Sequence, residues 1–218
     1  MKPRKFFKKE AVRFGWQTMK SNFWFFVLLL IVAGLIFHGP DIIAELLRED
    51  VLVLSVIISI ASWVLAMVVQ MGLVRIAIRF CDNEKGAFAD LFSCYPLFFK
   101  FLFGSILYGL IVLAGTILLI IPGIIWGIKY QFFGYFIVDQ GAGPIEALKR
   151  SSAITKGAKW NLFLFGLLLM AINLLGMLCL IIGLFATIPT AMVAVAFVYR
   201  KLLYQSEIAQ IPEIPQVG

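Results

Sequence analysis

Residues 101–128 read FLFGSILYGLIVLAGTILLIIPGIIWGI and contain no charged side chain. As one helix this stretch would be ~42 Å long at ~1.5 Å per residue, whereas the hydrocarbon core of a bilayer is ~30 Å thick. It contains Ile121-Pro122-Gly123, where proline removes a backbone donor and glycine permits a reversal of the chain. The stretch therefore predicts two membrane spans joined by a tight turn at 121–123.

Further uncharged runs lie on both sides of this stretch, at 21–40, 51–74 and 160–199. The last run would be ~60 Å long as one helix, so it predicts two crossings separated somewhere between Gly183 and Pro189. A signal peptide is the competing interpretation of the first run, but no small-residue cleavage motif follows it. The predicted spans are about 21–38, 51–74, 101–121, 124–138, 160–183 and 186–204, within a membrane domain at 21–205 that follows a basic segment (1–20) and precedes a tail (206–218).

The composition agrees with an all-α membrane protein. Of the 218 residues, 62% are hydrophobic and 14% are charged, whereas soluble domains carry about 25% charged residues. The net charge of +7 arises from basic residues beside apolar runs, which favours anionic lipid headgroups over nucleic acid as the partner. The three cysteines show no CxxC spacing, so neither a disulfide framework nor a zinc site is predicted.

The distribution of lysine and arginine predicts the orientation of the spans. Short loops rich in these residues stay cytoplasmic, and all nineteen basic residues except Arg48 and Lys129 fall on one side of the six-span arrangement. We therefore expect three hairpins entered from the cytoplasm, with both termini cytoplasmic, in the plasma membrane. Two segments on that side are expected to form short interfacial helices: Gly86 to Ser93, and Pro144 to Lys156, which has proline at its start and Gly157 after its end. A third helix is expected at Arg4 to Lys20, and packing of one of its sides on protein is the alternative to an in-plane position, because its apolar residues do not share a single face.

Several motifs together resemble a known group of sequences. They are Asp90-Leu-Phe-Ser, Leu118-Leu-Ile-Ile-Pro-Gly-Ile-Ile, Tyr135-Phe-Ile-Val-Asp, Glu146-Ala-Leu-Lys-Arg-Ser and Lys156-Gly-Ala-Lys-Trp. The set is similar to a family of prokaryotic six-span membrane proteins of unknown function, and to the membrane domain attached to some glycerophosphoryl diester phosphodiesterases. The resemblance implies a fold and a location without functional residues. Because the sequence ends at Gly218, we expect no attached phosphodiesterase domain and transfer no such activity.

Lys129 is the most informative polar residue, because it lies inside a predicted span. A lysine at the centre of a bilayer costs about 2.5–3.5 kcal/mol on insertion scales, so we expect it to snorkel, to pair, or to face a cavity. Candidate partners are Gln70, Asn173, Tyr130 and helix carbonyls. A possible cavity or lipid contact comprises Lys129, Gln131, Asn173 and Gln70, and possible lipid headgroup contacts are Lys149, Arg150, Lys156 and Lys159.

Catalytic chemistry is not indicated. His38 is expected to be an ordinary interface residue, and the acidic residues between Asp41 and Asp50 are expected to form a solvated outer loop. We predict no catalytic residue, no cofactor and no metal. The leading hypothesis is a non-enzymatic scaffold or accessory subunit that contacts lipids, a membrane partner or a second copy of itself. The alternative is a small transporter or lipid-handling protein with a polar cavity around Lys129, and an intramembrane enzyme is the weakest hypothesis.

Overall fold

The computed structural model describes residues 6–46, 52–179 and 182–208, with side chains for the same residues except 40–46 and 52. These residues form helices and connecting turns, with no strand among them. The elements are α1 (Lys8–Ser21), α2 (Phe23–Leu46), α3 (Leu52–Cys81), the 3-10 helices η1 (Phe88–Leu91) and η2 (Tyr95–Leu97), α4 (Phe98–Leu118), α5 (Ile120–Tyr130), α6 (Phe133–Gln140), α7 (Pro144–Thr155), α8 (Lys159–Leu178) and α9 (Leu184–Ile208).

Five segments in the described ranges are long and apolar enough to cross a membrane: Val53–Cys81, Phe88–Leu118, Ile120–Gln140, Lys159–Leu178 and Leu184–Ile208. A sixth is reached when Lys8–Ser21 and Phe23–Gly39, which meet at 91°, are taken together. The prediction of an all-α protein with several membrane-compatible helices is therefore confirmed. The prediction of exactly three transmembrane hairpins stays a prediction.

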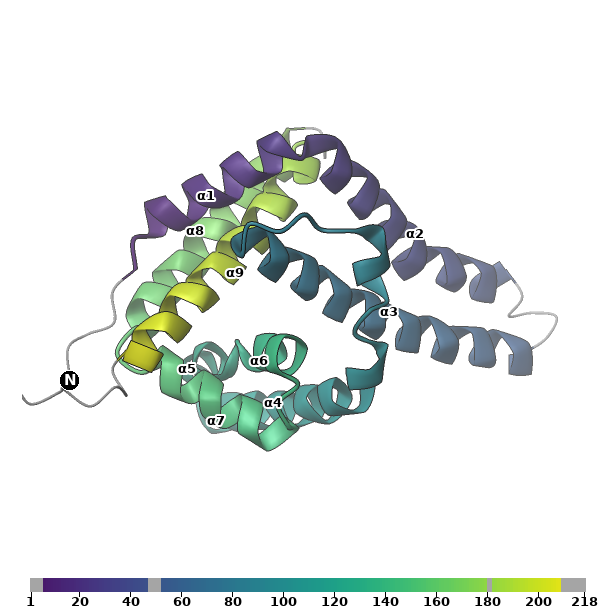
Figure 1. Cartoon of the computed structure of the whole chain (residues 1–218). Coiled ribbons are helices and arrows are strands. Elements are labelled where there is room, and N and C mark those ends of the chain that lie inside the picture. The colour runs from purple at the N-terminus through teal and green to yellow at the C-terminus, as the bar shows by residue number, and fades with distance from the viewer. Residues whose placement is uncertain (1–5, 47–51, 180–181, 209–218) are drawn as a thin grey trace, which may run out of the picture.

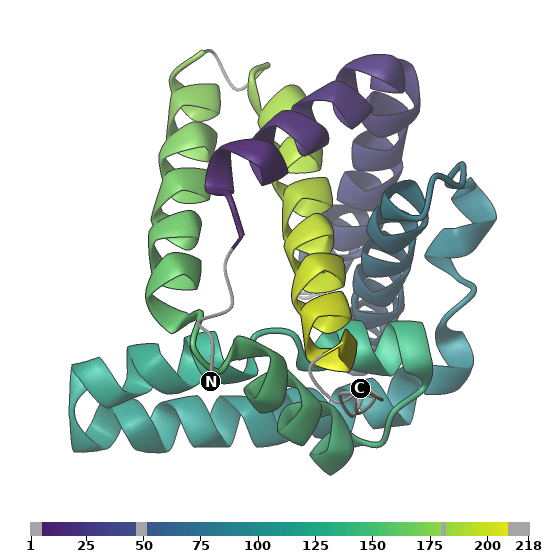
Figure 2. The same cartoon turned by 60° about the vertical axis from the view of Figure 1, so that its left-hand side comes forward.

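The helices pack in pairs that point in different directions. α2 packs along α3, α4 along α5, and α8 along α9. In Figure 1, the α2–α3 pair extends to the right of the molecule, and the α8–α9 pair lies on its left. In Figure 2, α4 and α5 lie across the lower end of the upright α8 and α9. The structure is thus a splayed arrangement of helix pairs rather than a bundle of parallel helices.

Helix α1 lies along α9, and this contact is the most extensive between any two of the described helices. Ala11, Gly15 and Met19 are buried at four-residue spacing, and Lys201 Nζ pairs with Glu10 Oε2 at 2.6 Å. At Gly15 the backbones are so close that a Cβ atom would lie 2.3 Å from the carbonyl oxygen of Thr190. The N-terminal segment therefore packs on protein, and it covers one side of the predicted sixth span.

The turn between α4 and α5 differs from the predicted one. The chain reverses at Leu119, whose backbone is extended (φ −166°, ψ 147°), and Pro122 lies within the first turn of α5. Proline is tolerated there because the first amides of a helix lack intrahelical acceptors. Gly123 instead serves the packing of the two helices, since a Cβ atom on it would lie 2.3 Å from Thr116 Oγ1.

The predicted fourth span is divided into two helices. α5 ends at Tyr130, and α6 begins at Phe133 after a turn at Gln131 and Phe132. Buried residues cover most of α6, including Phe133, Phe136 and Ile137, because this helix packs against α3, α4 and α7. The second half of the predicted span is consequently part of the protein core.

The two other predicted interfacial segments are helical. The segment 86–93 contains η1, a shorter 3-10 helix than expected. α7 begins at Pro144 and ends at Thr155, and Gly157 after it has a positive φ of 84°. Proline at the first helical position and glycine beyond the last turn are the signals that predicted this helix.

Candidate functional site

Helix α7 holds the C-terminal end of α5 in place. The Lys129 carbonyl oxygen accepts hydrogen bonds from Ser151 Oγ at 3.1 Å and from Thr155 Oγ1 at 3.0 Å. Ser151 Oγ also accepts the Phe132 amide at 3.1 Å. The backbone groups freed where α5 stops are thus satisfied by two buried hydroxyls, which fixes the position of Lys129 relative to α7.

A surface pocket of about 390 Å³ opens beside this junction, where α4, α5 and α7 meet. α7 contributes one helical face to it, at i, i+3, i+4 and i+7 spacing. The pocket is lined by Leu107, Ile111, Lys129, Tyr130, Ile145, Leu148, Lys149 and Ser152. One wall is therefore aliphatic, and the remaining wall carries two lysines and two hydroxyl-bearing side chains.

Lys129 is partly exposed, and its Nζ lies 4.7 Å from the centroid of the Tyr130 ring. A cation in this position is attracted by the negative face of the ring. Tyr130 is one of the candidate partners named from the sequence. Lys129 also lies beside α7, whose outward side chains Glu146, Lys149 and Arg150 are exposed. The lysine is therefore at the edge of the apolar helix pair rather than enclosed within it.

Neither pocket lysine is neutralised by a carboxylate of the described residues. Six acidic side chains of that part of the chain are paired with other basic residues: Glu10 with Lys201, Glu84 and Asp90 with Arg79, Asp82 and Asp139 with Arg200, and Glu146 with Arg150. Lys129 and Lys149 thus place two positive charges on one pocket. Two like charges there repel each other, and an anion between them would relieve the repulsion.

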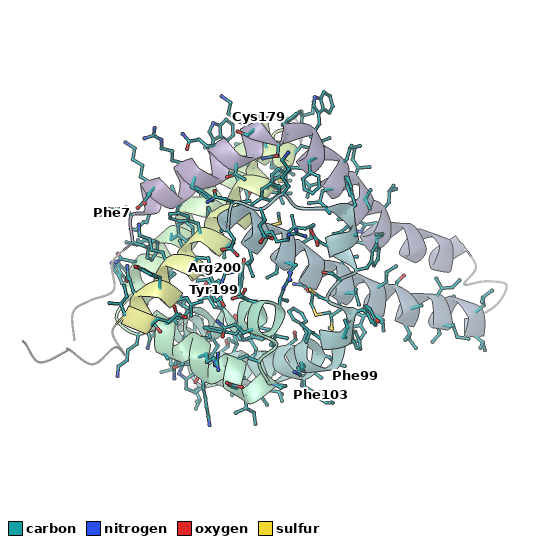
Figure 3. The ribbon with its side chains drawn as sticks, in the orientation of Figure 1. Phe7, Phe99, Phe103, Cys179, Tyr199 and Arg200 are labelled. Atoms are coloured by element: carbon teal, nitrogen blue, oxygen red, sulfur yellow. The ribbon has the colours of Figure 1, made fainter. Side chains whose placement is uncertain are left out.

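A second polar cluster joins α6 and α9 to Asp82, in the turn that follows α3. The Arg200 guanidinium binds both carboxylate oxygens of Asp139, at 2.7 and 2.9 Å, and both of Asp82, at 2.9 and 2.6 Å. Tyr199 donates its hydroxyl hydrogen to Asp139 Oδ2 at 2.9 Å. Figure 3 shows Tyr199 and Arg200 extending from α9 toward the middle of the molecule. This cluster is internally satisfied, so we assign it to the stability of the fold.

The other residues of the predicted cavity do not line the Lys129 pocket. Gln70 is exposed on α3. Gln131 Nε2 and Asn173 Oδ1 are buried without a hydrogen-bond partner among the described residues. A cavity that unites Gln70, Gln131, Asn173 and Lys129 thus stays a prediction, and the pocket observed at Lys129 has a different composition.

The four basic residues predicted to contact lipid headgroups lie in different surroundings. Lys149 lines the pocket, whereas Arg150 is bonded to Glu146 Oε1 at 2.5 Å and to Gln140 Oε1. Lys156 is exposed after the last turn of α7, and Lys159 begins α8. Only one of these four basic residues therefore shares a pocket with Lys129.

The sequence did not predict the other residues of the Lys129 pocket or those of the Arg200 cluster. For the pocket, the positions Ile145, Leu148 and Ser152 could have been grouped with Lys149, because helical spacing places them on one face. For the polar cluster, Asp139 was the available signal, since a carboxylate at the end of an apolar run requires a cationic or hydrogen-bonding partner. Nothing local in the sequence indicates that this partner is Arg200, which is distant in the chain.

Comparisons with known proteins find similarity to a family of unknown function and to uncharacterized mycobacterial proteins. Residues 104–206 match a family described as "Protein of unknown function (DUF975)". The chain is also similar to the uncharacterized proteins Mb2590 of Mycobacterium bovis and Rv2560 of Mycobacterium tuberculosis, with 26% identity over 159 residues in each case. These alignments cover 73% of this chain and 49% of each relative, so the chain spans about half the length of the curated relatives it matches. No solved structure matches.

Proposed function

We propose that this chain is a multi-pass integral membrane protein that acts as a non-enzymatic scaffold or accessory subunit. The observation that carries the proposal is an apolar stripe on the outer face of α4. Its members are exposed and recur at spacings of three and four residues: Phe99, Phe103, Ile106, Leu110, Leu113 and Ile117. Figure 3 shows Phe99 and Phe103 on the outer side of this helix. A continuous apolar stripe of this length requires lipid or another helix against it.

The tip of the α4–α5 pair extends this surface. Leu118, Leu119, Ile120 and Ile121 are each at least 69% exposed. Apolar surface costs roughly 25 cal/mol per Å² when it is left in water, so this tip favours a bilayer as its surroundings. The charge pattern supports a plasma-membrane location with both termini in the cytoplasm. The resemblance to the membrane domain of glycerophosphoryl diester phosphodiesterases supports the same location and carries no activity.

A crosslinking experiment in native membranes tests the scaffold role. A photoreactive amino acid replaces Leu113 on the exposed stripe, and the matched control places it at the buried Phe132. We expect Leu113 to yield one reproducible protein adduct that the control does not yield. Adducts with lipid alone at Leu113 would contradict the scaffold role, and release of the chain by alkaline carbonate would contradict membrane integration.

The pocket at Lys129 favours a second candidate, a lipid-handling protein. Its aliphatic wall and its two lysines match the two parts of an anionic lipid better than they match a small soluble solute. Transport would additionally require a continuous polar path. Flux of an anionic lipid across proteoliposomes that depends on Lys129 would support lipid transport, and its absence would leave the scaffold as the better candidate.

A further inference from the structure

We propose that the pocket between α4, α5 and α7 is a binding site for the phosphate headgroup of an anionic glycerophospholipid. The inference deepens the membrane role proposed above and rests on it. It names the ligand class of a site for which the relatives provide no assignment.

The first argument is charge. Lys129 and Lys149 line the same pocket, and neither has a carboxylate partner among the described residues. A phosphate carries negative charge on several oxygens and can accept hydrogen bonds from two ammonium groups at once. Ser152 and Tyr130 line the same pocket and bring hydroxyl donors, so the donor set is suited to a phosphate rather than to a cation or a neutral solute.

The second argument is the apolar wall. Leu107 and Ile111 lie one turn apart on α4 and face the pocket together with Ile145 of α7. Along α4 the same helical face continues past Ile111 with the exposed Ala114 and Leu118, and Leu118 lies about 10 Å farther at the helical rise. An acyl chain can therefore follow α4 from the pocket toward the tip of the helix pair. A free phosphate ion would leave this wall in contact with water.

The third argument is rigidity. The Lys129 carbonyl is held by Ser151 and Thr155 of the helix that carries Lys149. The side chain of Lys129 also lies over the Tyr130 ring. The backbone positions of the two lysines are thus set by the fold before any lipid binds, which lowers the entropy lost on binding.

The test uses the purified full-length protein in an uncharged detergent and native mass spectrometry. Phosphatidylglycerol, phosphatidylcholine with the same acyl chains, and inorganic phosphate are added in separate samples. We expect retention of phosphatidylglycerol over phosphatidylcholine, with no displacement by millimolar phosphate. Equal retention of the two lipids would contradict an anionic site, and displacement by inorganic phosphate would assign the pocket to a free anion.

Single lysine variants test whether phosphatidylglycerol binds in this pocket. Lys129→Gln and Lys149→Gln each remove one pocket charge, and Lys156→Gln removes an exposed charge outside the pocket. At about 1 kcal/mol per lysine, affinity for phosphatidylglycerol should fall about fivefold in each pocket variant and about thirtyfold in the double variant. Lys156→Gln should retain wild-type affinity. Equal losses in all three single variants would overturn the site in favour of general surface charge.

Further measurements distinguish a failure of the lipid-binding site from a failure of the proposed function. Carbonate extraction and the Leu113 crosslink are measured on the same double variant. Loss of selective lipid binding with unchanged membrane integration confirms the pocket within a membrane protein. If the wild-type protein shows no lipid selectivity but stays in the membrane, the headgroup site is refuted and the scaffold role is unaffected.

Discussion

Replacement of Asp139 by alanine should destabilise the protein more than replacement of either Asp82 or Tyr199 in the Arg200 cluster. The Asp139 side chain is 11% exposed and accepts three hydrogen bonds, one from Tyr199 and two from Arg200. In Asp139→Ala the buried Tyr199 hydroxyl loses its acceptor, which costs about 1–3 kcal/mol. Arg200 remains paired with Asp82, so its charge is not left alone. We expect a total loss of about 3 kcal/mol in the free energy of unfolding.

Two neighbouring variants provide the comparison. Asp82 is 39% exposed, so solvent screens its pair with Arg200, and Asp82→Ala should cost about 1 kcal/mol or less. Tyr199→Phe removes one hydrogen bond but leaves Asp139 bound to Arg200, so it should cost about 1 kcal/mol. The expected order is therefore Asp139→Ala well above Tyr199→Phe, with Asp82→Ala lowest.

The measurement is reversible unfolding of the full-length protein in mixed micelles, with helicity followed by circular dichroism as the denaturing detergent is increased. A double-mutant cycle with Arg200→Leu isolates the contact between Arg200 and Asp139, and its coupling energy should be about 1–3 kcal/mol. Equal losses for Asp139→Ala and Asp82→Ala, or a coupling energy near zero, would show that burial does not govern this cluster.

Three further predictions concern packing, capping and topology. Gly15→Ala places a Cβ atom 2.3 Å from a carbonyl oxygen of α9 and should destabilise the protein by about 1–3 kcal/mol. Gly166→Ala, where nothing lies within 4 Å, should stabilise α8 by about 0.5–1 kcal/mol; the same unfolding assay measures both, and a neutral Gly15→Ala would argue against the α1–α9 contact. Ser151→Ala leaves the Phe132 amide without its acceptor, while the Lys129 carbonyl keeps its hydrogen bond from Thr155. It should cost about 1–3 kcal/mol, whereas Ser152→Ala on the pocket surface should cost less than about 0.5 kcal/mol. Equal melting temperatures for these two serine variants would refute the capping role. Cys179, which is exposed at the end of α8, should react with a membrane-impermeant maleimide on intact cells if the α8–α9 turn faces outward, and labelling only after the cells are opened would reverse the proposed orientation.

The helical segments could be predicted largely from local sequence. The long apolar runs identified α2, α3, α4, α8 and α9, because the length of a run and its lack of charge depend on neighbouring residues alone. Pro144 and Gly157 marked α7 by the conformations that proline and glycine favour. The turn near Pro122 was placed slightly too late, since proline is compatible both with a turn and with the first turn of a helix.

The candidate site could be predicted only in part. Lys129 and Lys149 were each identified, Lys129 because charge is costly within an apolar run and Lys149 because basic residues collect beside such runs. Their common pocket was not predicted, because it depends on the packing of α7 against α4 and α5. The same limit applied to Arg200, whose two carboxylate partners, Asp82 after α3 and Asp139 on α6, are far from it in the chain.

The sequence by itself determined that this chain is helical, that its helices are apolar enough for a membrane, and where its positive charge accumulates. These properties follow from composition and from spacing along the chain, on which the solvation of each segment directly depends. Only the tertiary structure decided that α1 lies along α9, that α6 belongs to the core, and that Lys129 and Lys149 share one pocket. Such contacts join residues far apart in the chain, and their geometry depends on close approach at positions such as Gly15 and on hydrogen bonds such as those of Ser151.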